Sequence, residues 1–306
     1  MKDTQLKSNG FKALIKGFEH ELRKANKPED HVVAHSSYIK EFLSYVEEKE
    51  QFYISEVAQP IIDEYVLFLE RERVNLRDGE PLKETTINKH KNSLRKFWKY
   101  LHSEGVKVNA IMIKQKKSTE RVESTVLSHE EIEQLYSVCD DSALGYRDLA
   151  MIAIYYGCGL RRSEGHRLLL TDVDFRNSRL HIRKTKNRRE RYVNLSPTVQ
   201  KQIEEYVYSY RNFFLSDEST YEEFFIGERH RPITKVTLSK RIEALWLRVK
   251  DQYGSNKRIG LHSLRHSLGT HLYMQKIDIK EIALMLGQSS LEATEIYIHL
   301  KTKLKQ

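Results

Sequence analysis

The stretch at residues 261–300 reads LHSLRHSLGTHLYMQKIDIKEIALMLGQSSLEATEIYIHL and holds the richest pattern in the chain. Leucines recur at helical spacing through its first half, which predicts an amphipathic helix. His262 and Arg265 stand three residues apart, so they share one face of that helix. An imidazole and a guanidinium directed at one target suit an anion, and phosphate is the most obvious one. Tyr297 and His299 follow near the end of the stretch.

Length and composition bound the class of protein. The chain has 306 residues, enough for two ordinary domains, and its 39% hydrophobic and 31% charged residues indicate a globular protein rather than a disordered one. No apolar run is long enough to cross a bilayer, and the N-terminus carries no export signal. Two cysteines form no disulfide framework and suit a reducing compartment. We therefore expect a cytoplasmic protein without a membrane partner.

The charge balance points to a class of partner. The formal net charge is +9 and the sequence pI is about 9.2. A basic protein gains affinity for nucleic acid because neutralising phosphates releases counterions. Many basic proteins bind no nucleic acid, so charge alone leaves the matter open.

The first hundred residues predict four helices, because apolar side chains recur at helical spacing around residues 11–22, 38–46, 61–69 and 87–101. Short connections between them predict a helical bundle, and we place this domain at residues 1–108. Positive charge is concentrated on the fourth helix, at Lys83, Lys89, His90, Lys91, Arg95, Lys96 and Lys99. This face is either a DNA-binding surface or an ordinary solvated one.

A polar segment follows, and we interpret residues 109–126 as a basic linker. Its periodicity fades, and it carries Lys114, Lys116 and Lys117 in the run KQKKSTERVEST. A positively charged linker could cross a DNA backbone, or it could only join two domains.

Residues 127–306 form the second predicted domain. It opens with a capping box, in which Ser128 precedes Glu131 by three residues. Residues 180–184 and 191–195 alternate in part and predict a β-hairpin. The fold class is therefore mainly α with a small β-hairpin or sheet, an α+β arrangement.

An arginine stands in an unusual place in this second domain. The apolar run at residues 149–156 predicts a buried helix stopped by Gly-Cys-Gly, and Arg161 follows directly. A buried arginine is costly unless a partner neutralises it. Glu164, three residues on, is placed to orient it.

Together these elements resemble the tyrosine recombinases, the integrase and Xer-type group. The run GCGLRRSEGHRLLLTDVDF is similar to the family's first box, which implies a catalytic arginine at Arg161 with Glu164 as its acidic neighbour. LHSLRH is similar to the family's His-x-x-Arg box and implies His262 and Arg265. The resemblance implies a helical, SAM-like core-binding domain for DNA followed by a tyrosine-recombinase catalytic domain.

Two further boxes complete the resemblance. The hairpin KTKNRRERYVNL resembles the family's lysine-bearing strand pair and implies Lys186, with Lys184 as a weaker candidate. LGQSSLEATEIYIHL resembles the final box and implies Tyr297 as the nucleophile. The family usually has histidine or tryptophan where this chain has Gln288, which can donate a hydrogen bond to phosphate but cannot carry a proton. Many family members exchange a longer C-terminal helix between neighbouring subunits, and the few residues from Tyr297 to Gln306 put such an exchange in doubt here.

The resemblance implies transesterification on DNA. Tyr297 would attack the scissile phosphate, forming a 3′-phosphotyrosyl link and freeing a 5′-hydroxyl. Arg161 and Arg265 would hold the non-bridging oxygens, His262 would take the phenolic proton or bind an oxygen, and Lys186 would protonate the leaving oxygen. Such chemistry needs no metal and no cofactor, and the chain has no phosphate-cradling Gly-x-x-x-x-Gly-Lys.

The leading hypothesis is a site-specific recombinase acting on double-stranded DNA as a homotetramer on two sites. Two alternatives stay open: a type IB topoisomerase-like enzyme that nicks and reseals DNA, and a catalytically silent DNA-binding relative. The sequence does not distinguish integration, excision, inversion and dimer resolution. A zinc site at His262 and His266 is disfavoured because Ser263 stands where a zinc-helix motif has glutamate.

Overall fold

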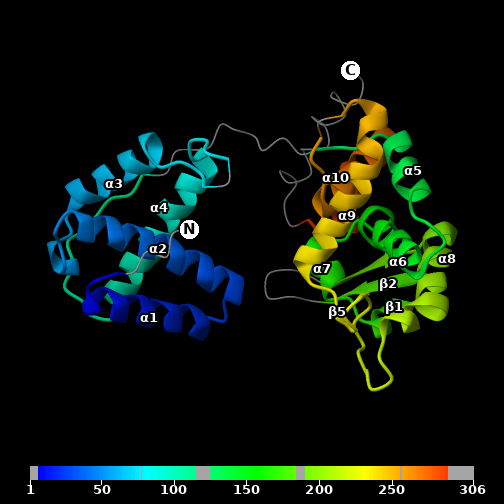
Figure 1. The fold of residues 1–306 in the computed structure, drawn as a ribbon, viewed down its shortest axis with the longest axis horizontal. Coiled ribbons are helices and arrows are strands. Elements are labelled where there is room, and N and C mark those ends of the chain that lie inside the picture. Colours follow the sequence, from blue (N-terminus) through cyan, green and yellow to red (C-terminus); the bar gives the residue numbers. More distant parts are fainter. Residues whose placement is uncertain (1–5, 77, 115–124, 184–189, 256, 289–306) are drawn as a thin grey trace. The chain divides into compact units, whose positions relative to one another are not determined.

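The computed structural model describes residues 6–76, 78–114, 125–183, 190–255 and 257–288. The chain divides into two compact units, Met1–Val122 and Glu123–Gln306 (Figure 1). Helices dominate both units, and the described strands are confined to the second, so the predicted fold class is confirmed. No helix in the described ranges is both long enough and apolar enough to span a membrane.

The first unit consists of helices, as predicted. Its four α-helices are α1 (Asn9–Lys24), α2 (Glu29–Glu48), α3 (Gln59–Arg71) and α4 (Glu84–Ser103). Local signals set their starts: Ser8 accepts a hydrogen bond from the backbone of Phe11, and Pro60 lies in the first turn of α3. Their apolar faces meet in one core, in which Phe18 contacts Phe97 edge to face and Phe42 contacts Tyr65.

The beginning of the predicted linker packs on the first unit. The indole of Trp98 donates to the carbonyl of Asn109 at 3.1 Å, and Ile113 is buried in the helical core. The side chain of Asn109 in turn donates to the carbonyls of Ser55 and Val57. The chain therefore stays attached to the helices up to residue 113. The domain limits at residues 108 and 127 stay predictions.

The second unit opens with the predicted capping box. Its helices and strands are α5 (His129–Ser137), α6 (Ala143–Ile152), α7 (Arg162–His166), β1 (Val173–Asp174), β2 (Arg179–Ile182), β3 (Arg191–Asn194), α8 (Pro197–Glu205), β4 (Ile226–Gly227), β5 (Arg231–Pro232), α9 (Lys235–Val249), α10 (Leu261–Met274) and α11 (Ile279–Leu286). The backbone N–H of Glu131 donates to the Ser128 hydroxyl, and the Glu131 carboxylate accepts from the Ser128 backbone at 2.7 Å. The box therefore forms as the sequence predicts.

The hairpin is part of a larger sheet. Strands β1, β2 and β3 pair antiparallel in that order, with Leu180 opposite Val193 and Ile182 opposite Arg191. Strands β4 and β5 form a separate antiparallel pair. The sequence predicted β2 and β3 but not the short strand β1.

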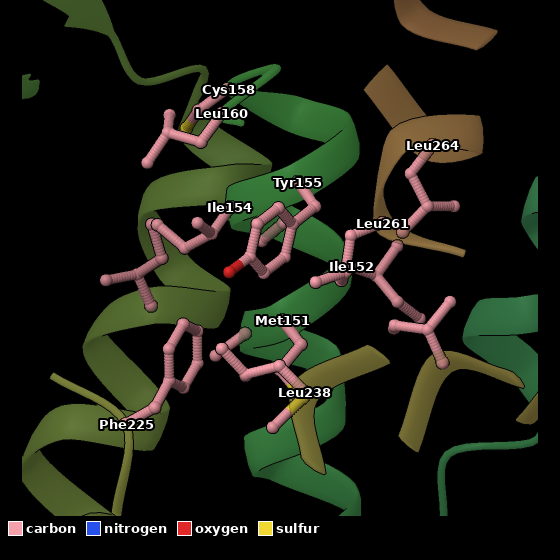
Figure 2. Packing of buried hydrophobic residues seen from close by; sticks show 14 of the residues in the cluster. Met151, Ile152, Ile154, Tyr155, Cys158, Leu160, Phe225, Leu238, Leu261 and Leu264 are labelled. Carbon is pink, nitrogen blue, oxygen red and sulfur yellow. The ribbon is translucent and has the colours of Figure 1, made fainter. Parts of the chain in front are cut away.

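The buried helix α6 is the centre of the second core. It continues into a π-helical turn, Ala153–Gly157, in which the N–H of Cys158 donates to the carbonyl of Ala153. Figure 2 shows the side chains of Met151, Ile154 and Tyr155 from this segment among Phe225, Leu238, Leu261 and Leu264 from later elements. The core therefore joins the segment before Arg161 to α10, which carries His262 and Arg265.

Candidate active site

Arg161 stands at the N-cap of α7, immediately after the buried segment. Its backbone N–H donates to Oε2 of Glu164 at 2.9 Å, and its guanidinium Nη1 donates to Oε1 of the same carboxylate at 2.9 Å. The predicted orientation of Arg161 by Glu164 is therefore confirmed as a contact. Gly159 precedes it with φ of +63°, and a Cβ there would lie 2.4 Å from Leu286, so glycine allows α11 to approach closely.

Arg265 is held inside the unit by backbone carbonyls. It lies on α10 and is only 3% exposed. Its Nη1 donates to the carbonyl of Gly159 and its Nη2 to the carbonyl of Leu286, both at 2.6 Å. His262, one turn earlier on the same helix, is exposed. The pair therefore shares a helix, with the arginine fixed and the histidine at the surface.

The end of α11 explains where these arginines are held. Gly287 adopts the left-handed conformation, with φ of +60°, and its N–H donates to the carbonyl of Leu284. The N–H of Gln288 donates to the carbonyl of Ala283 at 2.9 Å. These two bonds form a Schellman motif, and the carbonyls at positions 285, 286 and 287 lie beyond it.

Three arginines bind these three consecutive carbonyls. Arg191 donates from Nε to Met285 at 3.0 Å, Arg265 donates to Leu286, and Arg161 donates from Nη2 to Gly287 at 2.6 Å. The negative end of the α11 dipole therefore faces three cations from three different elements. We call these arginines, together with Glu164, the arginine cluster.

Arg191 is the member of the cluster that sequence reasoning missed. Its Nη1 and Nη2 donate to the two oxygens of Glu164 at 3.2 and 2.9 Å. The signal was in the strand pattern: Val193 and Leu195 are buried, Tyr192 is exposed, and alternation places Arg191 on the buried face. An arginine on the buried face of a strand needs a partner, and Glu164 is that partner.

The arginine cluster holds more positive than negative charge. Burial alone would raise the pKa of Glu164, but its hydrogen bonds and charge contacts with Arg191 and then Arg161 outweigh burial and lower that pKa to about 2. The carboxylate is therefore ionised at neutral pH. Three guanidiniums and one carboxylate leave a net charge of +2 over these four side chains, which are between 4% and 15% exposed. This arrangement favours an anionic ligand.

Comparison with known proteins decides the family. The sequence profile of the phage integrase family matches residues 125–303, more than half of the chain. The chain belongs to the phage integrase family. The profile of the phage integrase SAM-like domain matches residues 11–117, which agrees with the helical first unit. The resemblance described from the sequence is confirmed, and with it the enzyme class: the integrase is a tyrosine recombinase, which cuts and rejoins DNA through a tyrosine-linked intermediate.

Individual curated relatives are also named tyrosine recombinases. Tyrosine recombinase XerC of Lacticaseibacillus casei is 30% identical over 224 residues, which is 72% of this integrase and 74% of the relative. A tyrosine recombinase of Pseudothermotoga lettingae is 26% identical over 94% of this chain and 93% of its own. The structure of the Tn1549 transposon integrase in complex with transposon right end DNA superposes with a TM-score of 0.69 at 15% identity, covering 95% and 98% of the two chains, a likeness of fold.

The structure brings together four of the residues predicted for the integrase site. Arg161, Glu164 and Arg265 belong to the arginine cluster, and the backbone of Gln288 closes the motif beside it. Lys186 and Tyr297, with the weaker candidate Lys184, lie outside the described residues.

The predicted DNA-binding residues of the integrase have different environments. Lys89 and Lys114 are exposed, whereas Arg95 donates to the carbonyl of Ile113 and Lys96 donates to His35 at 2.8 Å. Lys116 and Lys117 lie outside the described residues.

Two side chains on α4, His90 and Lys91, differ from the expectation of a solvated or DNA-facing charge. His90 is 3% exposed and forms a hydrogen bond with the Tyr65 hydroxyl at 3.0 Å. Lys91 is 2% exposed and pairs with Glu70 at 3.4 Å, because its position on α4 faces the core of the first unit.

A metal site or a reactive cysteine would require side chains other than those of the arginine cluster. Within the described residues, no three His, Cys, Asp or Glu side chains gather as a metal ion would require. Cys158 is fully buried, and burial raises the pKa of its thiol to about 12. A thiol with that pKa is a packing residue and carries almost no thiolate at neutral pH.

Proposed function

We propose that this recombinase cleaves double-stranded DNA at a specific site by attack of Tyr297 on the scissile phosphate. The phenolic oxygen forms a bond to phosphorus, and the bond from phosphorus to the 5′-oxygen breaks. The products are a 3′-phosphotyrosyl link and a free 5′-hydroxyl. Attack by another 5′-hydroxyl reverses these bond changes and rejoins the strands in a new combination.

The observation that carries this proposal is the arginine cluster. Arg161 and Arg265 come from boxes far apart in the sequence, yet both donate to consecutive carbonyls at the end of α11. A scissile phosphate carries one negative charge and gains another as the phenolate attacks. The net charge of +2 in the cluster matches that requirement, since two arginines can balance both charges.

The way these arginines are held favours the transition state. A guanidinium has five N–H donors, so a group fixed along one edge can donate to phosphate from another. Arg161 and Arg265 are anchored by backbone carbonyls, which do not change rotamer. Donors already in place do not reorganise during the reaction, and this lowers the barrier more than the same charges would on mobile chains.

The remaining roles follow the family pattern on this chain. His262 takes the phenolic proton or donates to a phosphate oxygen, which its surface position on α10 permits. Lys186 gives a proton to the leaving 5′-oxygen. Gln288 donates a hydrogen bond to phosphate where relatives use histidine or tryptophan, so we expect a weaker contribution at that position rather than an inactive enzyme.

The proposal includes the assembly and the setting. We place the recombinase in the cytoplasm as a homotetramer on two recombination sites, with Lys89, Arg95, Lys96 and Lys114 contacting DNA phosphates. The Tn1549 neighbour is an integrase in complex with transposon right end DNA and other neighbours are Xer recombinases, so the proposal covers a mobile-element role and dimer resolution alike.

Covalent capture tests the proposal and identifies the target sequence in the same experiment. The tagged recombinase is purified from cells under denaturing conditions, and the DNA that stays attached is sequenced. Tyr297→Phe is the test variant, and Tyr208→Phe is the matched control because it removes the same hydroxyl from an exposed side chain in the same unit.

We expect attached DNA ending at one defined sequence for the wild type and Tyr208→Phe, and none for Tyr297→Phe. Attached DNA ending at many unrelated sequences would favour the topoisomerase-like alternative. Salt-sensitive DNA binding without any attached DNA would indicate the catalytically silent relative.

A further inference from the structure

We propose that Arg191 is a positioning residue for strand cleavage. It fixes Glu164 and the end of α11, and through them it holds the guanidiniums of Arg161 and Arg265 in place. This inference rests on the proposed function and gives a role to a residue of the hairpin box to which the resemblance assigned none.

The contacts of Arg191 connect two parts of the cluster. Two of its nitrogens bind the two oxygens of Glu164, and its third nitrogen binds the carbonyl of Met285. The side chain is 10% exposed. A planar guanidinium fits both a carboxylate fork and a carbonyl at fixed angles, which lysine cannot reproduce. Arg191 therefore ties the carboxylate that orients Arg161 to the helix end that anchors all three arginines.

Glu164 depends on this contact for its own position. Its carboxylate accepts from the backbone and the guanidinium of Arg161 and also lies 3.9 Å from Arg265. Without Arg191, its two oxygens would lose the donors on the β3 side, and the carboxylate could turn toward the other two arginines. The Arg161 guanidinium would then lose the fixed carboxylate that orients it toward the phosphate.

Gly287 supplies a second, independent observation. A Cβ at this position would lie 2.7 Å from Nη1 of Arg191 and 2.9 Å from its Cζ, and φ is +60°. The last turn of α11 therefore has no side chain at the one place where Arg191 crosses it. The carbonyl of this same glycine accepts a hydrogen bond from Arg161. Gly287 therefore both leaves room for the Arg191 side chain and holds the Arg161 guanidinium.

The test compares Arg191→Lys and Arg191→Ala with the control Arg179→Ala. Arg179 is a matched arginine because it lies on the neighbouring strand and pairs with Asp174 at 3.0 Å, but 42% of its side chain is exposed. The probe is a synthetic duplex carrying the sequence recovered by covalent capture. Formation of the covalent product is measured at saturating duplex, and the Kd is measured separately. Thermal unfolding reports whether each variant folds.

We expect Arg191→Lys and Arg191→Ala to slow covalent product formation about 10- to 100-fold, because small misplacement of catalytic groups has effects of this size. The Kd should change by less than about 3-fold, since most affinity comes from other phosphate contacts. Arg179→Ala should match the wild type in both measurements.

A second duplex separates positioning from general stability. It carries an uncharged methylphosphonate at the scissile position, which lowers the charge that the arginines must balance. If Arg191 acts through Arg161 and Arg265, the gap between variant and wild type narrows on this duplex. A defect of equal size on both duplexes would overturn the proposal, as would wild-type rates in both variants.

Hydrogen exchange gives a readout that does not depend on activity. The amides of Gly287 and Gln288 close the motif at the end of α11, and they should exchange faster in Arg191→Lys than in Arg179→Ala. Unchanged exchange would contradict the proposal, and failure of both Arg191 variants to fold would make the residue structural instead. Failure of the wild type to form any covalent product would reject the proposed function by itself.

Discussion

The arginine cluster of the second unit and the exposed lysine Lys89 of the first unit hold positive charge in opposite ways. In the arginine cluster, Arg161, Arg191 and Arg265 are almost completely covered and bound to backbone carbonyls and one carboxylate. On α4 of the first unit, Lys89 is exposed and Lys96 is half-buried. The guanidiniums have one geometry, whereas the ammonium of an exposed lysine samples many.

This difference corresponds to two functions on DNA, stabilising a transition state and binding the backbone. Charge that must stabilise a transition state is most effective when it is already in place and shielded from water. Charge that holds a DNA backbone needs only to be near it, because counterion release depends on the number of phosphates neutralised rather than on exact geometry. The following predictions use this contrast, beginning with the largest effect.

Removing a buried arginine should damage the rate far more than the affinity. We expect Arg265→Ala to slow cleavage on the order of 10²- to 10³-fold at saturating DNA, as for the loss of a preorganised donor. Arg265→Lys should recover little, because the single nitrogen of an ammonium cannot take the places of the two guanidinium nitrogens that bind the Gly159 and Leu286 carbonyls and still present a planar edge to phosphate. Single-turnover cleavage measures this effect, and Lys89→Ala is the comparison from the other unit. A similar loss of rate in both variants would remove the contrast.

Glu164→Gln should destabilise the second unit. The substitution leaves three covered arginines without their carboxylate, which we expect to cost about 3 kcal/mol of unfolding free energy at neutral pH. The pKa of Glu164 is lowered to about 2, so its contribution is complete above about pH 4.5 and is lost as pH falls toward 2. Urea denaturation across this pH range should show a steeper loss of stability in the wild type than in the variant, which keeps other carboxylates whose pKa is lowered, such as Asp140 and Asp174. Parallel curves for the two proteins would contradict the assignment.

His35 should make the first unit sensitive to mild acid. Lys96 donates to its Nε2 at 2.8 Å, so the ring is neutral and its Nδ1 donates to the Ser93 hydroxyl. Burial, followed by the charge of Lys96, lowers the pKa of His35 to about 4. The unfolded chain therefore takes up a proton first, and stability should fall by about 1 kcal/mol per pH unit below pH 6.5. Denaturation of His35→Gln should show a slope smaller by about one proton.

Lys96→Ala should give the smallest effect. We expect DNA affinity to fall a few-fold for every DNA sequence tested, and the slope of log K against log salt to fall by about one, because one phosphate contact is lost. Titrations at several salt concentrations measure both quantities. A change in sequence preference would instead indicate a base contact.

The helices and the sequence boxes could be predicted from the sequence because both depend on the spacing of residues close together in the chain. The apolar faces of α1 to α4 and the Ser128 capping box formed as predicted. The pairing of Arg161 with Glu164 was also accessible, since the two residues lie on one helical turn. Each of these features is determined within a few residues of chain.

Features that depend on distant segments were missed. Arg191 binds Glu164 and the carbonyl of Met285, which belong to other elements. The hairpin sequence alone therefore does not distinguish Arg191 from the neighbouring Arg188 and Arg189. Lys91 resembled a surface charge, and its pairing with Glu70 depends on how α3 meets α4. Tertiary packing decides such cases.

The π-helical turn at Ala153–Gly157 places a length constraint on the chain. A π turn contains one residue more than the α-helical turn it replaces, and it ends here directly before Gly159 and Arg161. Because the extra residue is taken up within one turn, the segments on either side keep their phase, and the Gly159 carbonyl meets Arg265. A one-residue insertion or deletion in α6 that no such turn takes up would rotate all that follows by about 100°. During divergence, this segment can therefore accept substitutions of similar volume far more readily than such a change in residue count.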